Sequence, residues 1–304
     1  MSRPMRFSVA IPQFAVDPRE VRRFLARAEE LGFDGAWTQE QIIGSKPVIS
    51  PLELLAYAAA CTERIRLGCA VFVTPLRNPV HLAKSITSLD QLSGGRIDVG
   101  VGTGGKFRPF AAFDSSPEHL VTRFTEGLDL MKRLWTEPSV TFDGRFWQLK
   151  DAPMEPKPVQ RPHPPVWFGA NHPNAVRRAV KLGNGFIGAG SSTTAAFTSL
   201  VPVARAAMEE FDRPDFMIAK RVYLAVDDDA ERARTRVGEA LGALYAGFPL
   251  GDLTSVAVYG TPDDVARGLQ EVKDAGAEMI LLNPLFDEHE QMERLVKDVL
   301  PQLT

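Results

Sequence analysis

The stretch RIDVGVGTGGKF, residues 96–107, is where a short apolar run passes into a cluster of glycines. Gly100, Gly102 and Gly105 fit the spacing G-x-G-x-x-G, which is typical of a dinucleotide-binding turn between a strand and a helix. Glycines at such a turn let backbone N–H groups approach an anion closely. On these residues alone, a tight turn without any ligand is an equally good interpretation.

The rest of the chain places this turn in a repeating pattern. Short apolar runs alternate with amphipathic stretches, which is typical of parallel strands that are each followed by a helix. The predicted strands are residues 6–12, 34–38, 65–75, 96–102, 165–170, 185–190, 216–226 and 278–285. The predicted helices are residues 17–32, 51–64, 78–95, 117–135, 173–183, 193–211, 229–247, 261–275 and 288–300. Pro202 predicts a kink or a break in the helix at 193–211.

Eight strand–helix units predict an α/β fold, a (β/α)8 TIM barrel built as one domain over residues 1–304. Residues 138–164 interrupt the alternation with prolines and spaced aromatics, so they predict an ordered insertion or hairpin. A doubly wound dinucleotide-binding sheet remains an alternative. Against it, the glycine turn falls in the fourth unit, no acidic residue closes the unit about 20 residues later, and no helix starts directly after the turn.

Composition narrows the class of protein. The 35 Lys and Arg against 38 Asp and Glu give a net charge of −3, and the cations are scattered, which argues against a nucleic-acid or membrane-surface partner. Cys61 and Cys69 lack metal-type spacing, and the five histidines do not group, so we expect no metal and a reduced, cytoplasmic protein. The apolar run at the start is too short for a signal peptide or a membrane span.

Several segments together resemble the bacterial luciferase-like monooxygenase superfamily. They are AEELGFDGAWTQEQ (28–41), TPLRNPVHLAKSITSLDQLSGGRIDVGVGTGG (74–105), FDGRFWQL (142–149), PKPVQRPHPPVWFGA (156–170), LGNGFIGAG (182–190) and YGTPDDVARGLQEVKDAGAEMILLNP (259–284). Within it, the chain is most similar to the deazaflavin-dependent oxidoreductases that use coenzyme F420. The resemblance implies a luciferase-like barrel with insertions, usually dimeric, that holds a flavin or deazaflavin at the carboxyl ends of its strands.

The expected cofactor-binding residues follow the strand ends. Small residues there leave room for a flat ring, and the helix start after residue 192 favours a phosphate, although the serines also fit a simple N-cap. The resemblance alone implies contacts on the third strand, including a non-proline cis peptide that joins Val71 and Phe72. The complete set is Val71, Phe72, Thr74, Gly102, Gly104, Gly105, Lys106, Gly169, Ala170, Asn171, Ala189, Gly190, Ser191 and Ser192.

The predicted catalytic residues are Glu40 and Gln41, after the second strand. The family has an acid followed by a histidine here, and the histidine often contributes to catalysis. Glu40 matches the acid, and we expect it to accept hydrogen bonds near the cofactor. Gln41 replaces the histidine and cannot titrate, so we expect it to position the substrate rather than to move protons. His172, after the fifth strand, is the histidine nearest the expected site and is better explained by a structural role.

Three functions are compatible with these observations. The leading hypothesis is hydride transfer between coenzyme F420 and an unidentified organic small molecule, for which Lys106 and Arg108 are candidate contacts to the acidic cofactor tail. The first alternative is an FMN-dependent monooxygenase of the same fold. The second is a non-catalytic deazaflavin-binding protein, which the missing histidine favours. A homodimer is expected through residues 51–64 and 80–93, because the first of these helices is apolar on more faces than one barrel wall covers.

Overall fold

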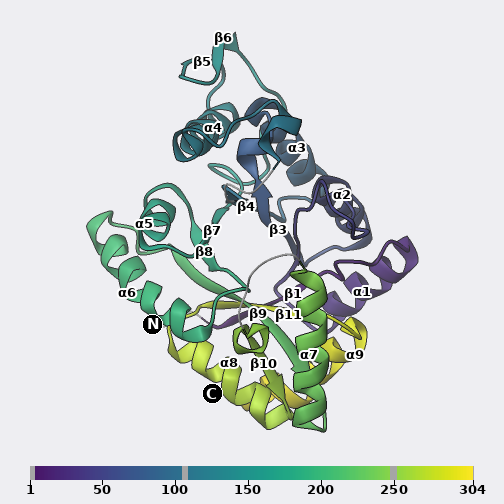
Figure 1. Cartoon of the computed structure of the whole chain (residues 1–304). Helices are drawn as coiled ribbons and strands as arrows, with labels where there is room; N and C mark the ends of the chain where they lie inside the picture. The colour runs from purple at the N-terminus through teal and green to yellow at the C-terminus, as the bar shows by residue number, and fades with distance from the viewer. Residues whose placement is uncertain (1–3, 105–108, 247–251, 304) are drawn as a thin grey trace.

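A closed barrel of eight parallel strands forms the centre of the computed structural model, which describes residues 4–104, 109–246 and 252–303 (Figure 1). Each strand pairs with its neighbour in chain order, and pairing between the first and last and between β8 and β9 closes the ring. The barrel strands are β1 (Arg6–Ala10), β2 (Gly35–Thr38), β3 (Arg66–Val73), β4 (Ile97–Gly102), β7 (Val166–Ala170), β8 (Gly185–Gly188), β9 (Met217–Val226) and β11 (Met279–Pro284). The predicted (β/α)8 fold is confirmed, and the doubly wound alternative is excluded.

Helices surround the barrel in the order of the chain (Figure 1). Local sequence sets many of their first turns: Asp17, Asn78 and Thr261 accept hydrogen bonds from the first N–H groups, and a proline follows each cap. The helices are α1 (Pro18–Glu30), α2 (Pro51–Cys61), α3 (Pro79–Leu92), α4 (Leu120–Thr136), α5 (Pro173–Leu182), α6 (Thr194–Glu210), α7 (Ala230–Leu244), α8 (Pro262–Asp274) and α9 (Glu288–Arg294). Among the described residues, no helix is long and apolar enough to cross a membrane.

Helix α6 is continuous through Pro202, so the predicted division into two pieces is wrong, whereas the predicted kink stays a prediction. A proline inside a helix leaves the carbonyl four residues earlier without its donor. That carbonyl belongs to Thr198, which is exposed, as Pro202 itself is. Water can therefore satisfy the carbonyl, while Phe197 and Val201 keep the apolar face of the helix buried.

Three further features refine the expected elements. Strand β10 (Ala257–Gly260) lies between α7 and α8, where no strand was predicted, and pairs with the second half of β9 outside the closed ring. The final helix is regular only over α9 and continues as a wider turn at Leu295–Val299 and a 3-10 turn at Leu300–Gln302. The interruption at 138–164 contains the predicted hairpin, β5 (Val140–Asp143) and β6 (Gln148–Ala152).

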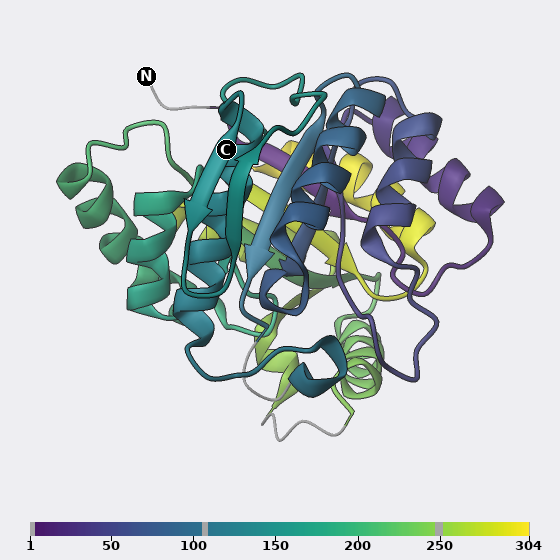
Figure 2. The same ribbon diagram turned by 90° about the horizontal axis from the view of Figure 1, so that it is seen from above.

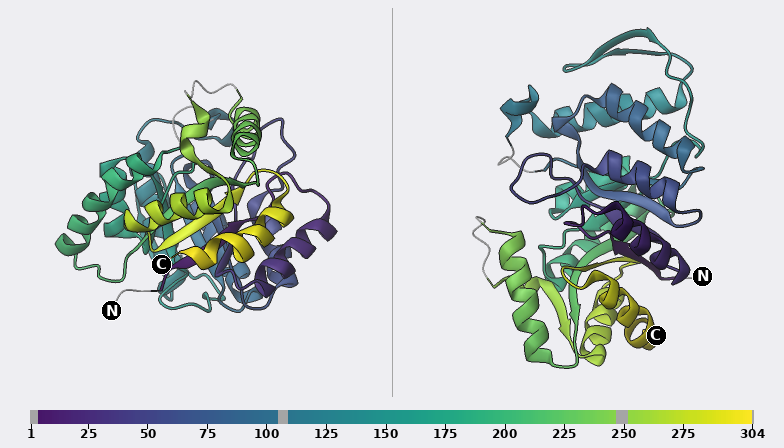
Figure 3. Two further views of the ribbon diagram at one scale, coloured as in Figure 1. Left: turned by 90° about the horizontal axis from the view of Figure 1, so that it is seen from below. Right: turned by 90° about the vertical axis from the view of Figure 1, so that its right-hand side faces the viewer.

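The β5–β6 hairpin projects beyond α3 and α4, far from α8 and α9 (Figures 1 and 3). Glu126 on α4 accepts hydrogen bonds from the backbone N–H groups of Arg145, Phe146 and Trp147 at 2.7–3.2 Å. The Arg123 guanidinium lies 4.9 Å from the centre of the Trp147 ring. These contacts anchor the hairpin on the outside of the barrel, away from the strand ends.

Two tryptophans fill the centre of the barrel. Trp37 and Trp167 meet edge to face, with ring centres 5.8 Å apart. Each ring occupies the space beside a strand glycine: a Cβ at Gly68 would clash with Trp37, and one at Gly185 would clash with Trp167. Glycine is therefore required in these two strands because it leaves volume for the large rings.

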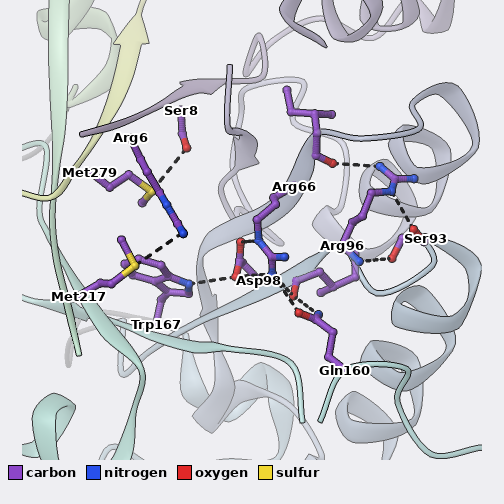
Figure 4. Close-up of polar contacts among 12 residues, drawn as sticks. Arg6, Ser8, Arg66, Ser93, Arg96, Asp98, Gln160, Trp167, Met217 and Met279 are labelled. Carbon is purple, nitrogen blue, oxygen red and sulfur yellow. Dashed lines mark hydrogen bonds and ion pairs between the residues drawn. The ribbon is translucent and has the colours of Figure 1, made fainter. Parts of the chain in front are cut away.

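A polar network occupies the amino end of the barrel (Figure 4). Asp98 is 4% exposed and accepts two hydrogen bonds from Arg66, at 2.7 and 2.9 Å, and one from the Trp167 indole at 3.2 Å. Gln160 accepts from Arg66 at 3.1 Å and donates to Asp90 at 2.7 Å. The side chains at this end thus satisfy one another, as expected for the end of a TIM barrel that serves stability.

Candidate active site

A cavity of about 620 Å³ lies at the opposite end, where the strands finish. Figure 2 shows α7 and the short helix η2 (Phe110–Phe113) at this end, toward which the strand arrows point. The lining comes from six barrel strands or the segments that follow them, β1, β2, β3, β4, β8 and β9, and from the end of α7. Its described residues are Gln13, Gln39, Glu40, Gln41, Ile43, Gly44, Ser45, Lys46, Ala70, Val71, Val73, Gly104, Ser191, Arg221, Tyr223, Ala243, Leu244, Tyr245 and Ala246.

Glu40 connects the ends of β2 and β3. Its side chain is 1% exposed, and its oxygens accept from the Val73 N–H at 2.6 Å and from Arg77 Nε at 2.8 Å, with a further contact from Arg77 Nη2. The carboxylate is therefore already bound by donors of this chain, although it also lines the cavity. The structure shows that Glu40 links the ends of β2 and β3. Its role as an acceptor for the cofactor remains a prediction.

Gln41 lies at the boundary between two cavities. It lines the main cavity and a second one of about 440 Å³ beside α2 and α3. Its side-chain amide lies against Gly44, where a Cβ would overlap with Nε2. The structure therefore places Gln41 at the cavity rim, in a position to contact a bound molecule.

The cis peptide at the end of β3 joins Ala70 and Val71, so its predicted place at Val71–Phe72 is wrong by one residue. The pairing of β3 with β4 shifts register between Cys69 and Phe72, and this bulge decides which side chains face inward. Val71 lines the cavity, whereas Phe72 is fully buried away from it. Thr74 also lies outside the lining, and its buried hydroxyl has no hydrogen-bond partner in the described part of the chain.

Val71 explains two of the predicted glycines. A Cβ at Gly102 would lie 2.6 Å from one Val71 methyl group, and one at Gly169 would lie 3.0 Å from the other. Both glycines therefore leave room for Val71, and a cofactor contact at either stays a prediction. Gly104 does line the cavity, with a φ of 71° that favours glycine. Gly105 and Lys106, like Arg108, lie outside the described residues.

The predicted residues after β7 lie away from the cavity lining. Ala170 is buried, whereas Asn171 is exposed. His172 is the N-cap of α5, and its Nδ1 accepts from the Asn174 N–H at 3.2 Å. His172 therefore caps a helix, which is the structural role that the sequence favoured for it.

The segment after β8 is held from behind by Lys220 on β9. The Lys220 ammonium donates to the carbonyls of Ala189 at 2.7 Å and Ser192 at 2.8 Å, and it lies 3.3 Å from the Ser192 hydroxyl. Ser191 alone among the four predicted residues of this segment lines the cavity. A Cβ at Gly190 would lie 2.8 Å from the Tyr223 ring, so this glycine permits close packing.

Seven polar residues of the described lining were not predicted from the sequence: Gln13, Gln39, Ser45, Lys46, Arg221, Tyr223 and Tyr245. Arg221 and Tyr223 lie in the middle of β9, and Tyr245 follows α7. Lys220 and Arg221 are adjacent charges in the apolar stretch FMIAKRVYLAV (216–226), which was a usable signal. Buried charges in a barrel strand need partners, so two together indicate a polar site.

The polar and apolar residues that line the cavity fit a flat heteroaromatic cofactor. Gln13 Oε1 is buried at the cavity and has no hydrogen-bond partner within the described residues. A buried acceptor without a partner costs free energy, so a bound donor is the simplest explanation. Ala70, Val71 and Val73 supply an apolar wall for a ring, and Lys46 supplies a cation at the exposed rim. Most small-molecule sites combine apolar walls and few polar groups in this way.

Known proteins resemble this chain in sequence and in fold. The F420-dependent glucose-6-phosphate dehydrogenase of Kineococcus radiotolerans is 28% identical, covering 98% of this chain and 96% of its own. The enzyme of the same description from Amycolatopsis mediterranei is 25% identical, over 94% and 95%. The monooxygenase RslO1 of Streptomyces bottropensis has the same fold, with a TM-score of 0.86 at 24% identity over 99% of this chain and 100% of its own.

A second solved structure agrees. The coenzyme F420-dependent tetrahydromethanopterin reductase of Methanopyrus kandleri has a TM-score of 0.83 at 20% identity, covering 99% of this chain and 100% of its own. The family model described as luciferase-like monooxygenase matches residues 5–251. These findings confirm the resemblance that the sequence motifs indicated. The chain belongs to the luciferase-like monooxygenase family.

Proposed function

We propose that this protein is a coenzyme F420-dependent oxidoreductase that transfers a hydride between the deazaflavin and an organic substrate. The observation that carries the proposal is the cavity at the carboxyl ends of the strands, which combines an apolar wall with the orphaned acceptor of Gln13. Relatives over nearly the whole chain are named F420-dependent glucose-6-phosphate dehydrogenases, which supports this cofactor.

Each part of the cavity has a task toward this cofactor. Ala70 and Val71 would pack against a ring and exclude water from it, and Gln13 would accept a hydrogen bond from a ring-edge donor. Lys46 lies exposed at the rim, where its charge attracts the acidic lactyl-glutamyl tail. When bound, the deazaflavin supplies the carbon that carries the hydride, and the chain supplies orientation and electrostatics.

A binding titration tests the cofactor directly. Purified protein is titrated with coenzyme F420, FMN and FAD while fluorescence is recorded. We expect the tightest binding for coenzyme F420 and, because its tail is acidic, weaker binding as salt is raised. Tighter binding of FMN would favour the flavin monooxygenase instead. Binding without turnover of any offered substrate would favour a non-catalytic deazaflavin-binding protein.

The substitution Lys46→Ala tests whether Lys46 contacts the cofactor tail or only contributes to the general surface charge. We expect it to weaken coenzyme F420 binding about 3- to 5-fold, the effect of losing one exposed ion pair of up to 1 kcal/mol, and to leave FMN binding nearly unchanged. Lys150→Ala is the matched control, because Lys150 is exposed on the remote β5–β6 hairpin. Equal effects of the two substitutions would remove Lys46 from the site.

The proposal includes a homodimer through α2 and α3, which packs apolar helix surface that one barrel leaves uncovered. Ala60 is exposed on α2, and Leu92, at the end of α3, is 72% exposed. Burial of such surface stabilises an assembly by roughly 25 cal/mol per Å². We expect sedimentation to show a dimer, and Ala60→Glu to produce monomers. A wild-type monomer at micromolar concentration would contradict the dimer.

A further inference from the structure

Two tyrosines that are 22 positions apart in the chain meet in the cavity lining. The hydroxyls of Tyr223, on β9, and Tyr245, after α7, are 2.8 Å apart, and the rings are nearly perpendicular with centres separated by 6.2 Å. Tyr223 is 2% exposed, whereas Tyr245 is half-buried and followed by the exposed Ala246. The pair therefore leads from the interior of the cavity toward its rim.

Arg221 places a fixed positive charge beside this pair. Its guanidinium lies 5.1 Å from the centre of the Tyr223 ring. Asn283 accepts from its Nε at 2.7 Å, and Gln39 accepts from its Nη2 at 2.5 Å, so the group is held in place by neutral partners. Because neither of these two partners is a carboxylate, the positive charge of Arg221 is not neutralised by them. Such a cation favours negative charge on a neighbouring oxygen.

The other titratable groups of the described lining are poorly suited to proton transfer. Glu40 is bound by Arg77 and the Val73 N–H, and Lys46 is exposed at the rim. Arg221 does not deprotonate in proteins. Burial, together with the adjacent Tyr223, raises the pKa of Tyr245, so this hydroxyl keeps its proton at neutral pH. Two tyrosine hydroxyls thus remain as proton carriers among the described lining residues.

We propose that Tyr223 is the catalytic proton donor of this site, that Tyr245 restores its proton, and that the substrate is a ketone and alcohol pair. The proposal rests on the proposed function for its hydride source. In the reducing direction, bound reduced cofactor would supply the hydride to the substrate carbonyl carbon, and the C=O π electrons would move to oxygen. That oxygen then bonds the Tyr223 proton. The resulting tyrosinate lies beside Arg221 and takes the proton of Tyr245, which is replaced from water.

The overall change is balanced: a ketone, one hydride and one proton give an alcohol, while the reduced cofactor becomes oxidised. Alcohol oxidation runs through the same atoms in reverse. This arrangement assigns to the tyrosine pair the proton transfer that Gln41 cannot perform, since an amide does not titrate. It also gives Arg221 a task, which is to stabilise the tyrosinate.

Phenylalanine substitutions remove each hydroxyl and preserve the ring. With reduced coenzyme F420 and a panel of aliphatic, alicyclic and aromatic ketones, we expect Tyr223→Phe to lower turnover about 100-fold or more, in the range of general acid catalysis. Tyr245→Phe is expected to lower it about 10-fold and to change the solvent isotope effect. Tyr259→Phe, on β10 outside the cavity, is the matched control and is expected to keep wild-type turnover.

Two readouts do not depend on turnover. The dissociation constant for coenzyme F420 is expected to change less than threefold in both cavity variants, since neither tyrosine is assigned to cofactor affinity. The chain has four tyrosines, so each can be followed by NMR in protein labelled with 13C at the tyrosine Cζ. Adding the cofactor is expected to shift the resonances of Tyr223 and Tyr245. The signal of Tyr57, whose hydroxyl donates to the Pro18 carbonyl on the outside, is expected to stay in place.

The outcomes distinguish the two proposals. A wild-type protein that fails to bind coenzyme F420 overturns the proposed function. Normal cofactor binding with full turnover by Tyr223→Phe overturns the tyrosine donor, as does the absence of cofactor-induced shifts at both tyrosines. Cofactor binding by the wild type with no reduction of any ketone in the panel overturns the substrate class.

Discussion

The two ends of the barrel both bury polar side chains, but they differ in how these groups are satisfied. At the amino end, Arg66 donates to Asp98 and to Gln160, and the Trp167 indole donates to Asp98 (Figure 4). At the carboxyl end, Gln13 carries a buried oxygen without a partner in the described chain, beside a cavity of about 620 Å³. A satisfied network stabilises the fold, whereas an orphaned acceptor is available to a ligand.

The carboxyl end also contains satisfied groups, of which Glu40 lines the cavity and Lys220 lies outside the lining. Glu40 joins the ends of β2 and β3 through Val73 and Arg77, and Lys220 holds the carbonyls that follow β8. Glu40 and Lys220 therefore form a supporting layer. Hydrogen bonds of Glu40 and Lys220 fix the strand ends, and Gln13, Gln41 and Arg221 line the cavity that they support, as a preorganised site requires.

The largest effect is expected from the amino end. Asp98→Ala removes the carboxylate that pairs with Arg66 and leaves the Trp167 indole without its acceptor, so we expect the free energy of unfolding to fall by about 3 kcal/mol, the lower end for a broken buried ion pair because Arg66 is partly exposed and keeps Gln160 as an acceptor. Urea unfolding measures the loss, and the affinity for coenzyme F420 should stay unchanged. Asp98→Asn, which keeps one acceptor, should lose less. A changed cofactor affinity in well-folded protein would contradict the separation of the two ends.

Lys220 gives a pH-dependent test of the supporting layer. Burial, and secondarily Arg221, lowers the pKa of Lys220 from 10.5 to about 7 in the folded state. Between these values the unfolded chain binds a proton that the folded chain has lost, so folding is relatively favoured as pH rises. The wild type should therefore gain up to about 1.4 kcal/mol per pH unit over Lys220→Met between pH 7 and 10.

Urea unfolding of both proteins at pH 7, 8 and 9 measures this slope. The surface substitution Lys150→Met should show none, since Lys150 is exposed. A constant difference between the wild type and Lys220→Met across these pH values would mean that Lys220 stays charged, held by its carbonyl acceptors.

Gln13 tests whether the orphaned acceptor is meant for a ligand. Gln13→Leu should weaken coenzyme F420 binding about 5- to 10-fold, corresponding to the loss of roughly one hydrogen bond of 1–1.4 kcal/mol. The thermal midpoint should not fall, because the substitution removes a buried oxygen that has no hydrogen-bond partner among the described residues. A lower midpoint with unchanged affinity would show that Gln13 serves the fold instead.

The smallest effect is expected at Gln41. Gln41→Ala should raise the apparent Michaelis constant or lower turnover only a few-fold, leaving the pH profile unchanged because an amide does not titrate. The substitution also opens the boundary between the two cavities at Gly44. Kinetics identical to the wild type would place Gln41 outside the working site, and a loss of several orders of magnitude would indicate a direct transition-state contact.

The sequence by itself determined the barrel, because strand and helix periodicity is local. Each apolar run and each capped helix could be read without knowing its neighbours, and the order of eight such units allows few arrangements. The rule that barrel sites form at the carboxyl ends of strands also directed attention to Gln41, which lies at the cavity rim. Strand β10 was missed because four residues between two helices carry too weak a pattern.

Only the tertiary structure decided which side chains face the cavity, because direction depends on register and on irregularities in the strands. The shift in β3 turns Val71 inward and Phe72 outward, and one residue of difference reverses the assignment. Tyr223 and Tyr245 are 22 positions apart, and their hydroxyls meet only because α7 returns to the end of β9. Periodicity identifies such elements, whereas a contact between them is a property of the closed barrel.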